Sequence, residues 1–253
     1  MSSPGHVLLL LAAGLAAGAV NGIAGGGTLL SFPALLAVGL GPVSANVTNT
    51  VAIWPGYLSS ALTWRAELVR DRARHASLVL VSAIGAVVGT ALLLTAPAHV
   101  FRALVPYLVL GATALLAAQP AISRALARRG GPDRPAPRPA VTAVATFAAS
   151  VYGAYFGGGL GIILLAVLAL GMRSDIQRLS GLKALLALVV NTVAILGFVV
   201  FGPVDWAAAA LIAPASFLGG VLGARIAQHL DPAVLRAAIV VLGVGVGVRL
   251  LTA

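Results

Sequence analysis

The polar chemistry of this chain rests on very few side chains inside strongly apolar segments. Lys183 is the only lysine, and it lies in the stretch G-L-K-A-L-L-A-L-V-V-N. Burial of an unpaired charge in a membrane is costly, so an ionisable group in such a stretch is a functional hypothesis by default. Lysine near a helix end can also extend its ammonium group to the interface, and a snorkelling Lys183 is therefore the alternative.

Two triple glycines, at 25–27 and 157–159, interrupt the first long apolar stretch of each half. A half-helix that begins after such a break points free backbone N–H groups and a partial positive charge ahead of it. Gly27 followed by Thr28 would begin one half-helix, and Gly159 would precede the other. Two positive helix ends and one lysine predict an anion site. The alternative is a long tilted helix whose glycines allow close packing.

Amide and hydroxyl side chains near these features could donate hydrogen bonds to the oxygens of an anion. Each of them could instead bond a neighbouring helix within the bundle. The predicted substrate-binding residues are Asn21, Gly26, Gly27, Thr28, Thr48, Asn49, Gly158, Gly159, Lys183 and Asn191.

Signatures of enzymes and of cofactor sites are missing from the sequence. There is no phosphate-binding G-x-x-x-x-G-K-[ST] loop, and there is no cysteine. The four histidines are far apart and lack the spacing of metal ligands. The six carboxylates lie mostly between the apolar segments, which argues against a carboxylate relay in the membrane. We expect no enzyme activity, no cofactor and no bound metal.

The composition is that of an integral membrane protein. Only 9% of the residues are charged and 60% are hydrophobic, whereas soluble domains carry roughly 25% charged residues. This excludes a soluble enzyme and a nucleic-acid-binding module. The net charge of +10 is explained by arginines in the loops that set orientation in the bilayer. We expect an all-α, multi-pass protein of the inner membrane.

Eight apolar segments are predicted, and a polar linker at 128–139 divides them into a first repeat (1–127) and a second repeat (140–253). The segments are Val7–Leu40, Ala45–Trp64, His75–Thr95, Val100–Ala118, Ala140–Gly171, Leu179–Phe201, Trp206–Ala227 and Ala233–Leu251.

The two halves share landmarks at a nearly constant offset. Each triple glycine stands 14 residues before another glycine, and Gly85 and Gly89 match Gly219 and Gly223 at an offset of 134. The first segment of each half, about 35 and 32 residues long, is too long for one span and too short for two. We therefore predict two repeats, each a broken or re-entrant helix pair at a triple glycine, followed by three transmembrane helices.

The arginines favour inverted repeats. If each first segment crosses once, the two sides of the membrane hold ten and five arginines. If each first segment enters the membrane and returns to the same side, the halves are inverted. The two sides then hold thirteen and two arginines. Because cytoplasmic loops are enriched in basic residues, the second arrangement is favoured. It places both termini outside and the linker in the cytoplasm.

Six stretches distributed over both halves have a characteristic pattern. They are A-A-G-A-V-N-G-I-A-G-G-G-T-L-L-S-F-P-A-L-L (16–36), S-A-N-V-T-N-T (44–50), Y-G-A-Y-F-G-G-G-L-G-I-I-L-L (152–165), R-L-S-G-L-K-A-L-L-A-L-V-V-N-T-V-A (178–194), V-D-W (204–206) and G-G-V-L-G-A-R (219–225). In these stretches, which extend in order over most of the chain, the sequence resembles the TauE/SafE family of bacterial sulfite and organosulfonate exporters. Ser180 departs from the family, which often has asparagine at that position.

The resemblance implies a permease that exports small sulfur-containing anions such as sulfite or organosulfonates, without an ATPase partner. The residues themselves predict a secondary transporter with an anion site in a lipid bilayer. An anion channel and a membrane scaffold subunit without transport are the alternatives. The repeated G-x-x-x-G spacing could pack helices within one protomer or between two, which leaves a homodimer open.

Overall fold

The computed structural model describes residues 3–23, 26–63, 72–128, 139–172, 174, 176–226 and 232–252. Within these ranges the chain forms ten α-helices and no strand. The helices are α1 (Pro4–Ile23), α2 (Thr28–Ala37), α3 (Pro42–Thr63), α5 (Arg72–Thr95), α6 (Ala98–Arg128), α7 (Pro139–Tyr155), α8 (Leu160–Gly171), α9 (Ile176–Phe201), α10 (Trp206–Ile226) and α11 (Pro232–Thr252).

Local sequence sets where several of these helices begin. Prolines occupy the first position of α1, α3, α7 and α11, where the missing N–H costs nothing and the fixed φ suits a helix. Asp205 precedes α10, and its Oδ1 accepts a hydrogen bond from the Ala208 N–H at 2.9 Å. This is a side-chain N-cap, which satisfies one of the free donors of the first turn.

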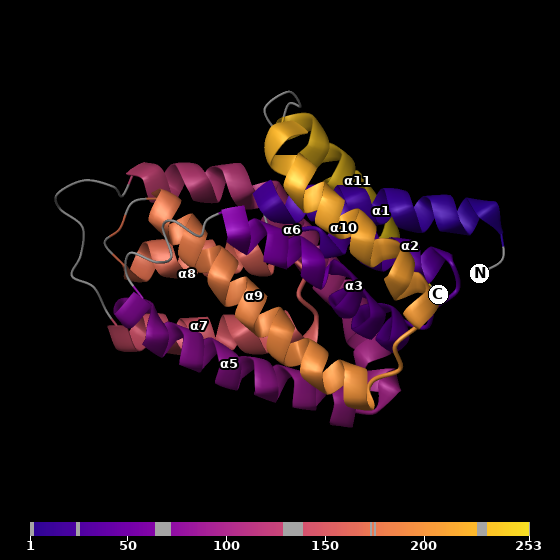
Figure 1. Ribbon diagram of the computed structural model, residues 1–253, viewed down its shortest axis with the longest axis horizontal. Coiled ribbons are helices and arrows are strands. Elements are labelled where there is room, and N and C mark those ends of the chain that lie inside the picture. The colour runs from indigo at the N-terminus through magenta and orange to yellow at the C-terminus, as the bar shows by residue number, and fades with distance from the viewer. Residues whose placement is uncertain are drawn as a thin grey trace.

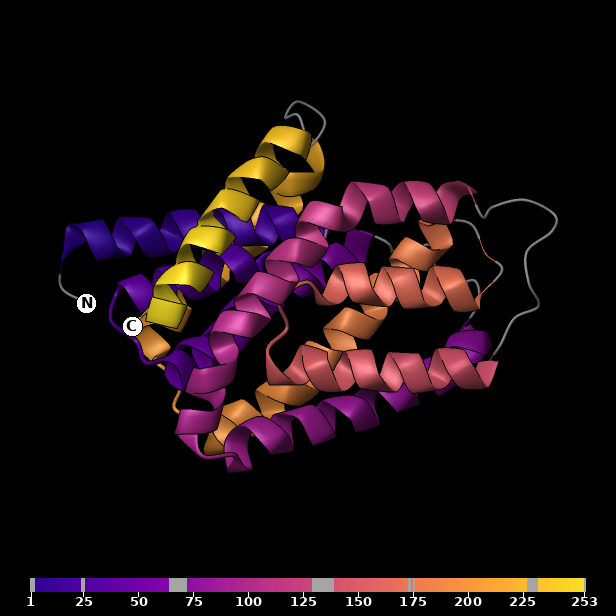
Figure 2. The same cartoon turned by 180° about the vertical axis from the view of Figure 1, so that it is seen from behind.

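The first apolar segment of each half contains a long helix followed by a short one. Helices α1 and α7 have 20 and 17 residues, whereas α2 and α8 have 10 and 12. At 1.5 Å per residue the short helices are about 15 and 18 Å long, roughly half of the hydrocarbon core of a bilayer. Each folds back beside the long helix that precedes it (Figures 1 and 2).

Four helices in the described ranges are long and apolar enough to cross a membrane by length and composition. The qualifying stretches are Pro4–Asn21, His75–Thr95, Ala98–Ala125 and Gln177–Phe201. Large apolar side chains remain exposed on several helices, for example Leu80 on α5, Phe201 on α9 and Val241 on α11. A large apolar outer surface is a liability in water but suits contact with lipid tails.

Glycines bring the first helix of each half against the third long helix of the other half. A Cβ atom added at Gly14 of α1 would lie 2.9 Å from the Ile212 carbonyl oxygen of α10, and one at Gly18 would overlap Ser216. The second half repeats the arrangement, because a Cβ at Gly85 of α5 would lie 2.7 Å from the Phe147 carbonyl oxygen of α7. The G-x-x-x-G glycines in these helices thus pack within the chain.

The order of these contacts gives the relative directions of the helices. On α1 and α10 the residue numbers rise together from Gly14–Ile212 to Gly18–Ser216, so the two helices run parallel. Helices α5 and α7 are likewise parallel, since Gly85 meets Phe147 and the next turn meets Val151.

Helices α6 and α11 form an antiparallel pair on the outside of the bundle. Arg236, near the start of α11, donates from Nε to Gln119 Oε1 at 3.4 Å, and later on α11 Gly243 lies against Thr113.

The sequence predicted a segment that ends at Ala118, but α6 continues to Arg128. That segment was defined by apolar character, and the helix extends beyond it with polar residues.

The two chain ends lie at the same end of the molecule. The start of α1 and the end of α11 are close together, whereas the end of α6 and the start of α7 lie at the opposite end (Figures 1 and 2). Of the polar linker predicted at 128–139, residues 129–138 fall outside the described residues. Helices α1 and α7, which begin the two halves, therefore start from opposite ends.

Candidate substrate site at the two glycine breaks

Asn21 closes the first break. Its Oδ1 accepts a hydrogen bond from the Gly27 N–H at 2.8 Å, and the side chain is 3% exposed. Gly27 has no room for a side chain, because a Cβ there would overlap the Ala17 carbonyl oxygen and lie 2.8 Å from Asn21 Cγ. The triple glycine predicts free N–H groups at this helix start, whereas the Gly27 N–H is already bonded within the chain. Gly26 is buried with more room, because a Cβ there would lie 3.6 Å from the nearest atom, a side-chain carbon of Leu116.

The second break depends on left-handed backbone. Gly157 has a φ of 80° and Gly159 a φ of 74°, a region that residues with a side chain rarely adopt. The Gly158 carbonyl oxygen accepts a hydrogen bond from the Tyr152 hydroxyl at 2.6 Å. A Cβ at Gly157 would lie 3.9 Å from Thr28 Oγ1. The two glycine breaks, 132 residues apart in the sequence, are therefore neighbours.

Tyr57 of α3 joins the breaks to α9. Its hydroxyl interacts with the polar side chains of Thr28 and Asn191, and the residue is 4% exposed. Asn191 also donates from Nδ2 to the Ala187 carbonyl oxygen at 2.8 Å. Tyr57 is not among the predicted site residues, although a tyrosine within a predicted span is a detectable polar signal. The predicted residues Thr28 and Asn191 meet at this hydroxyl.

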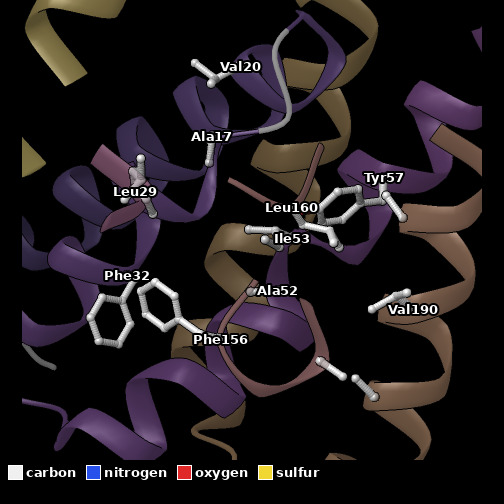
Figure 3. Packing of buried hydrophobic residues seen from close by; sticks show 14 of the residues in the cluster. Ala17, Val20, Leu29, Phe32, Ala52, Ile53, Tyr57, Phe156, Leu160 and Val190 are labelled. Atoms are coloured by element: carbon white, nitrogen blue, oxygen red, sulfur yellow. The ribbon is translucent and has the colours of Figure 1, made fainter. Parts of the chain in front are cut away.

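An apolar layer borders this polar cluster. Figure 3 shows Leu160, the first residue of α8, beside Ile53 and Tyr57 of α3. The aromatic ring of Phe156 packs edge-on against Phe32 of α2, with ring centroids 5.6 Å apart. Ile53, Leu160 and Phe156 are all at most 2% exposed. The two breaks are thus packed tightly against each other, and only a few polar groups lie between them.

Lys183 is buried, and no described residue supplies a counter-charge. It is 6% exposed, and in the described part of the chain no hydrogen bond or ion pair joins it to another residue. Lys183, Ala187 and Asn191 follow at four-residue intervals, which places them on one face of α9. Eight residues separate Lys183 from Asn191, a rise of about 12 Å. Lys183 therefore lies two turns from the Tyr57 cluster.

Asn49 lies on the other side of that cluster. Helices α3 and α9 are antiparallel, because Ser44 bonds the Pro203 carbonyl oxygen while Trp54 bonds Thr192. Asn49 precedes Tyr57 on α3 by the eight residues that separate Lys183 from Asn191 on α9. Asn49 and Lys183 are therefore two turns from the cluster in opposite directions.

Thr48 lies near Asn49 but has a different partner. Its Oγ1 accepts a hydrogen bond from the Asp205 N–H at 2.8 Å. Asp205 in turn caps α10, so the Thr48 hydroxyl connects α3 to the start of α10. Among the described residues, no three His, Cys, Asp or Glu side chains are grouped so that they could share a metal ion. The polar centre of the bundle therefore consists mainly of neutral amides and hydroxyls.

Comparisons with known proteins agree with a membrane transporter. The family model "Sulfite exporter TauE/SafE" matches residues 10–250. "Probable membrane transporter protein ORF9" of Sinorhizobium sp is 25% identical over 249 residues, which cover 97% of this chain and 93% of that protein. "Probable membrane transporter protein YfcA" of Escherichia coli (strain K12) is 24% identical over 251 residues, which cover 99% of this chain and 91% of that protein.

A third relative, "Probable membrane transporter protein" of Haemophilus influenzae, is 25% identical over 238 residues, which cover 92% of this chain and 90% of that protein. No solved structure matches the chain. The relatives and the apolar helices agree on a multi-pass membrane transporter, consistent with the inner membrane, that handles a small-molecule substrate. The family model matches almost the whole chain, and this chain therefore belongs to the sulfite exporter TauE/SafE family.

Proposed function

We propose that this protein is a secondary transporter that exports small sulfur-containing anions, such as sulfite or an organosulfonate, across the inner membrane. The observation that carries the proposal is Lys183, a buried ammonium group with no acidic partner in the described part of the chain. A buried charge normally requires an opposite charge, and a transported anion would supply it. The name of the matching family supports the substrate class and the direction.

The path of the anion would follow one face of α9. Lys183 supplies the positive charge, and the amide and hydroxyl groups of Asn191, Tyr57 and Thr28 offer hydrogen bonds two turns further on. Together with Asn21 they surround the start of α2, whose dipole favours a negative charge. The Asn21 carbonyl group occupies the Gly27 N–H in this conformation, so an anion would have to displace it.

Alternating access would follow from inverted repeats. The proposal is supported by the opposite starting ends of α1 and α7 (Figures 1 and 2). It is also supported by the matching contacts of α1 with α10 and of α7 with α5. Transporters of this architecture bind substrate where the repeats meet and rock one repeat against the other. Short helices such as α2 and α8 would then be re-entrant and end within the membrane.

Impermeant labelling tests this topology. In this chain without cysteines, single cysteines at Ser3, Gly131 and Thr252 can be exposed to an impermeant maleimide in whole cells. Inverted repeats predict labelling at both terminal positions and none at Gly131, because thirteen arginines would lie on the cytoplasmic side. Labelling at Gly131 without labelling at either terminus would refute the arrangement.

Flux through the purified protein tests the proposed function. Sulfite loaded into proteoliposomes should leave at a rate that saturates with concentration and responds to an imposed ion gradient. Flux that does not saturate and ignores gradients would indicate an anion channel. A protein that neither transports nor is thermally stabilised by any of a panel of anions would favour a scaffold role and contradict the proposal.

A further inference from the structure

Two amide side chains on α3 are buried with polar atoms that have no hydrogen-bond partner among the described residues. Asn46 is 0% exposed and Asn49 is 1% exposed. Within the described ranges, neither Oδ1 nor Nδ2 of Asn49 has a partner, and Asn46 Oδ1 has none either. Buried amide groups are nearly always hydrogen-bonded, because burial removes the water that would otherwise satisfy them. The proposed anion path along α9 does not use these atoms.

One of the unsatisfied oxygens belongs to Asn46, which contacts a negative helix end. Asn46 donates from Nδ2 to the carbonyl oxygen of Tyr155 at 2.9 Å, and Tyr155 is the last residue of α7. Since a carbonyl can only accept, this contact leaves the Asn46 amide oxygen as the free atom. Asn49, three residues further on, lies on the same face of α3. The carboxyl-terminal end of a helix carries a partial negative charge.

We propose that Asn46 and Asn49 bind a monovalent metal cation, Na⁺, at the end of α7, and that this ion is coupled to anion transport. The inference rests on the proposed function, whose coupling ion it names. Small hard cations prefer oxygen ligands, and in transporters with broken helices the half-helix carboxyl-terminal ends help to coordinate Na⁺. The Asp205 backbone bonds the neighbouring Thr48, so a carboxylate residue lies at the same level of the bundle.

The location separates the cation from the lysine. Asn49, Ile53 and Tyr57 follow at four-residue intervals on α3, so Asn49 is about 12 Å from Tyr57 along the helix axis. Lys183 lies a similar distance beyond the cluster in the opposite direction. Repulsion between Na⁺ and the Lys183 ammonium is therefore weakened by separation, and the buried Ile53 and Tyr57 lie between them.

Thermal stability in different salts tests the cation site. The full-length protein in detergent should melt at a higher temperature in NaCl than in equimolar choline chloride, because a ligand that binds only the folded state stabilises it. Asn49→Leu should abolish this shift. Asn49→Asp should retain it with a lower half-saturating Na⁺ concentration, because a carboxylate adds negative charge to the site. Thr146→Val, which removes another buried unpaired oxygen, is the matched control and should leave the shift unchanged.

Equal melting temperatures in the two salts would overturn the inference, as would an unchanged shift in Asn49→Leu. If Asn49→Leu does not fold, the Asn49→Asp variant provides the test. Loss of the Na⁺-dependent shift in melting temperature in Asn49→Asp would refute the site. Stabilisation by sulfite, measured separately in choline buffer, tests the proposed function independently of the cation site. Sulfite binding without any Na⁺ response would refute the cation site alone, whereas a Na⁺ response without sulfite binding or flux would refute the proposed substrate.

Discussion

Replacing Lys183 by methionine should weaken sulfite binding at least tenfold. The change keeps the length and the apolar stem of the side chain but removes the charge, and a hydrogen bond to a charged group contributes about 1.5–3 kcal/mol. A tenfold loss corresponds to about 1.4 kcal/mol. Lys183→Arg should restore binding only in part, because a planar guanidinium does not replace a compact ammonium group. Calorimetric titration of the purified variants with sulfite measures both effects.

The substrate-free melting temperature separates this role from snorkelling. An unpaired buried ammonium destabilises the fold, so Lys183→Met should melt at a higher temperature than the unmodified protein. Arg178→Met is the matched control, since Arg178 is an exposed cation near the start of the same helix. Its removal should change neither sulfite affinity nor stability appreciably. Unaltered affinity in Lys183→Met would exclude the lysine from the anion site.

Alanine at Gly27 should reduce transport at least tenfold, whereas alanine at Gly26 should be tolerated. A Cβ at Gly27 would overlap the Ala17 backbone and push against Asn21. This overlap would force α2 away from α1. Overpacking of this kind costs roughly 1–3 kcal/mol. At Gly26 the nearest atom is 3.6 Å away, an ordinary contact. Flux in proteoliposomes, together with the melting temperature of each variant, measures the difference.

The Gly27→Ala and Gly26→Ala variants also test the role of the first glycine break in sulfite binding. A Gly27→Ala protein that remains folded but does not bind sulfite would place the defect in the site itself. Wild-type flux in Gly27→Ala would show that α2 can shift without consequence, and the break would then have no part in binding. Gly26→Ala controls for the loss of a glycine from the triple-glycine sequence without a steric conflict.

The class of the protein could be predicted because hydrophobicity acts locally. Long apolar stretches almost without charges require a lipid environment wherever they lie in the fold, and the sequence therefore predicted an all-helical membrane protein. Prolines at helix starts and Asp205 before α10 mark helix boundaries through their own backbone and side-chain chemistry. The sequence left two possibilities for Lys183, burial among apolar neighbours or snorkelling near a helix end, and the packing of the helices buries it.

The grouping of the polar residues could not be predicted, because it depends on helix directions and faces. Asn49 and Lys183 were selected for one site, but the antiparallel packing of α3 and α9 places them on opposite sides of Tyr57. Thr48 was selected as a ligand residue and instead bonds the Asp205 backbone, 157 residues away.

Asn46 and Tyr57 were not selected, although one meets the end of α7 and the other joins Thr28 to Asn191. Each of these contacts connects helices that are distant in the sequence. Local patterns determine which side chains must be buried, but the partner of a buried polar group is determined only when the helices pack.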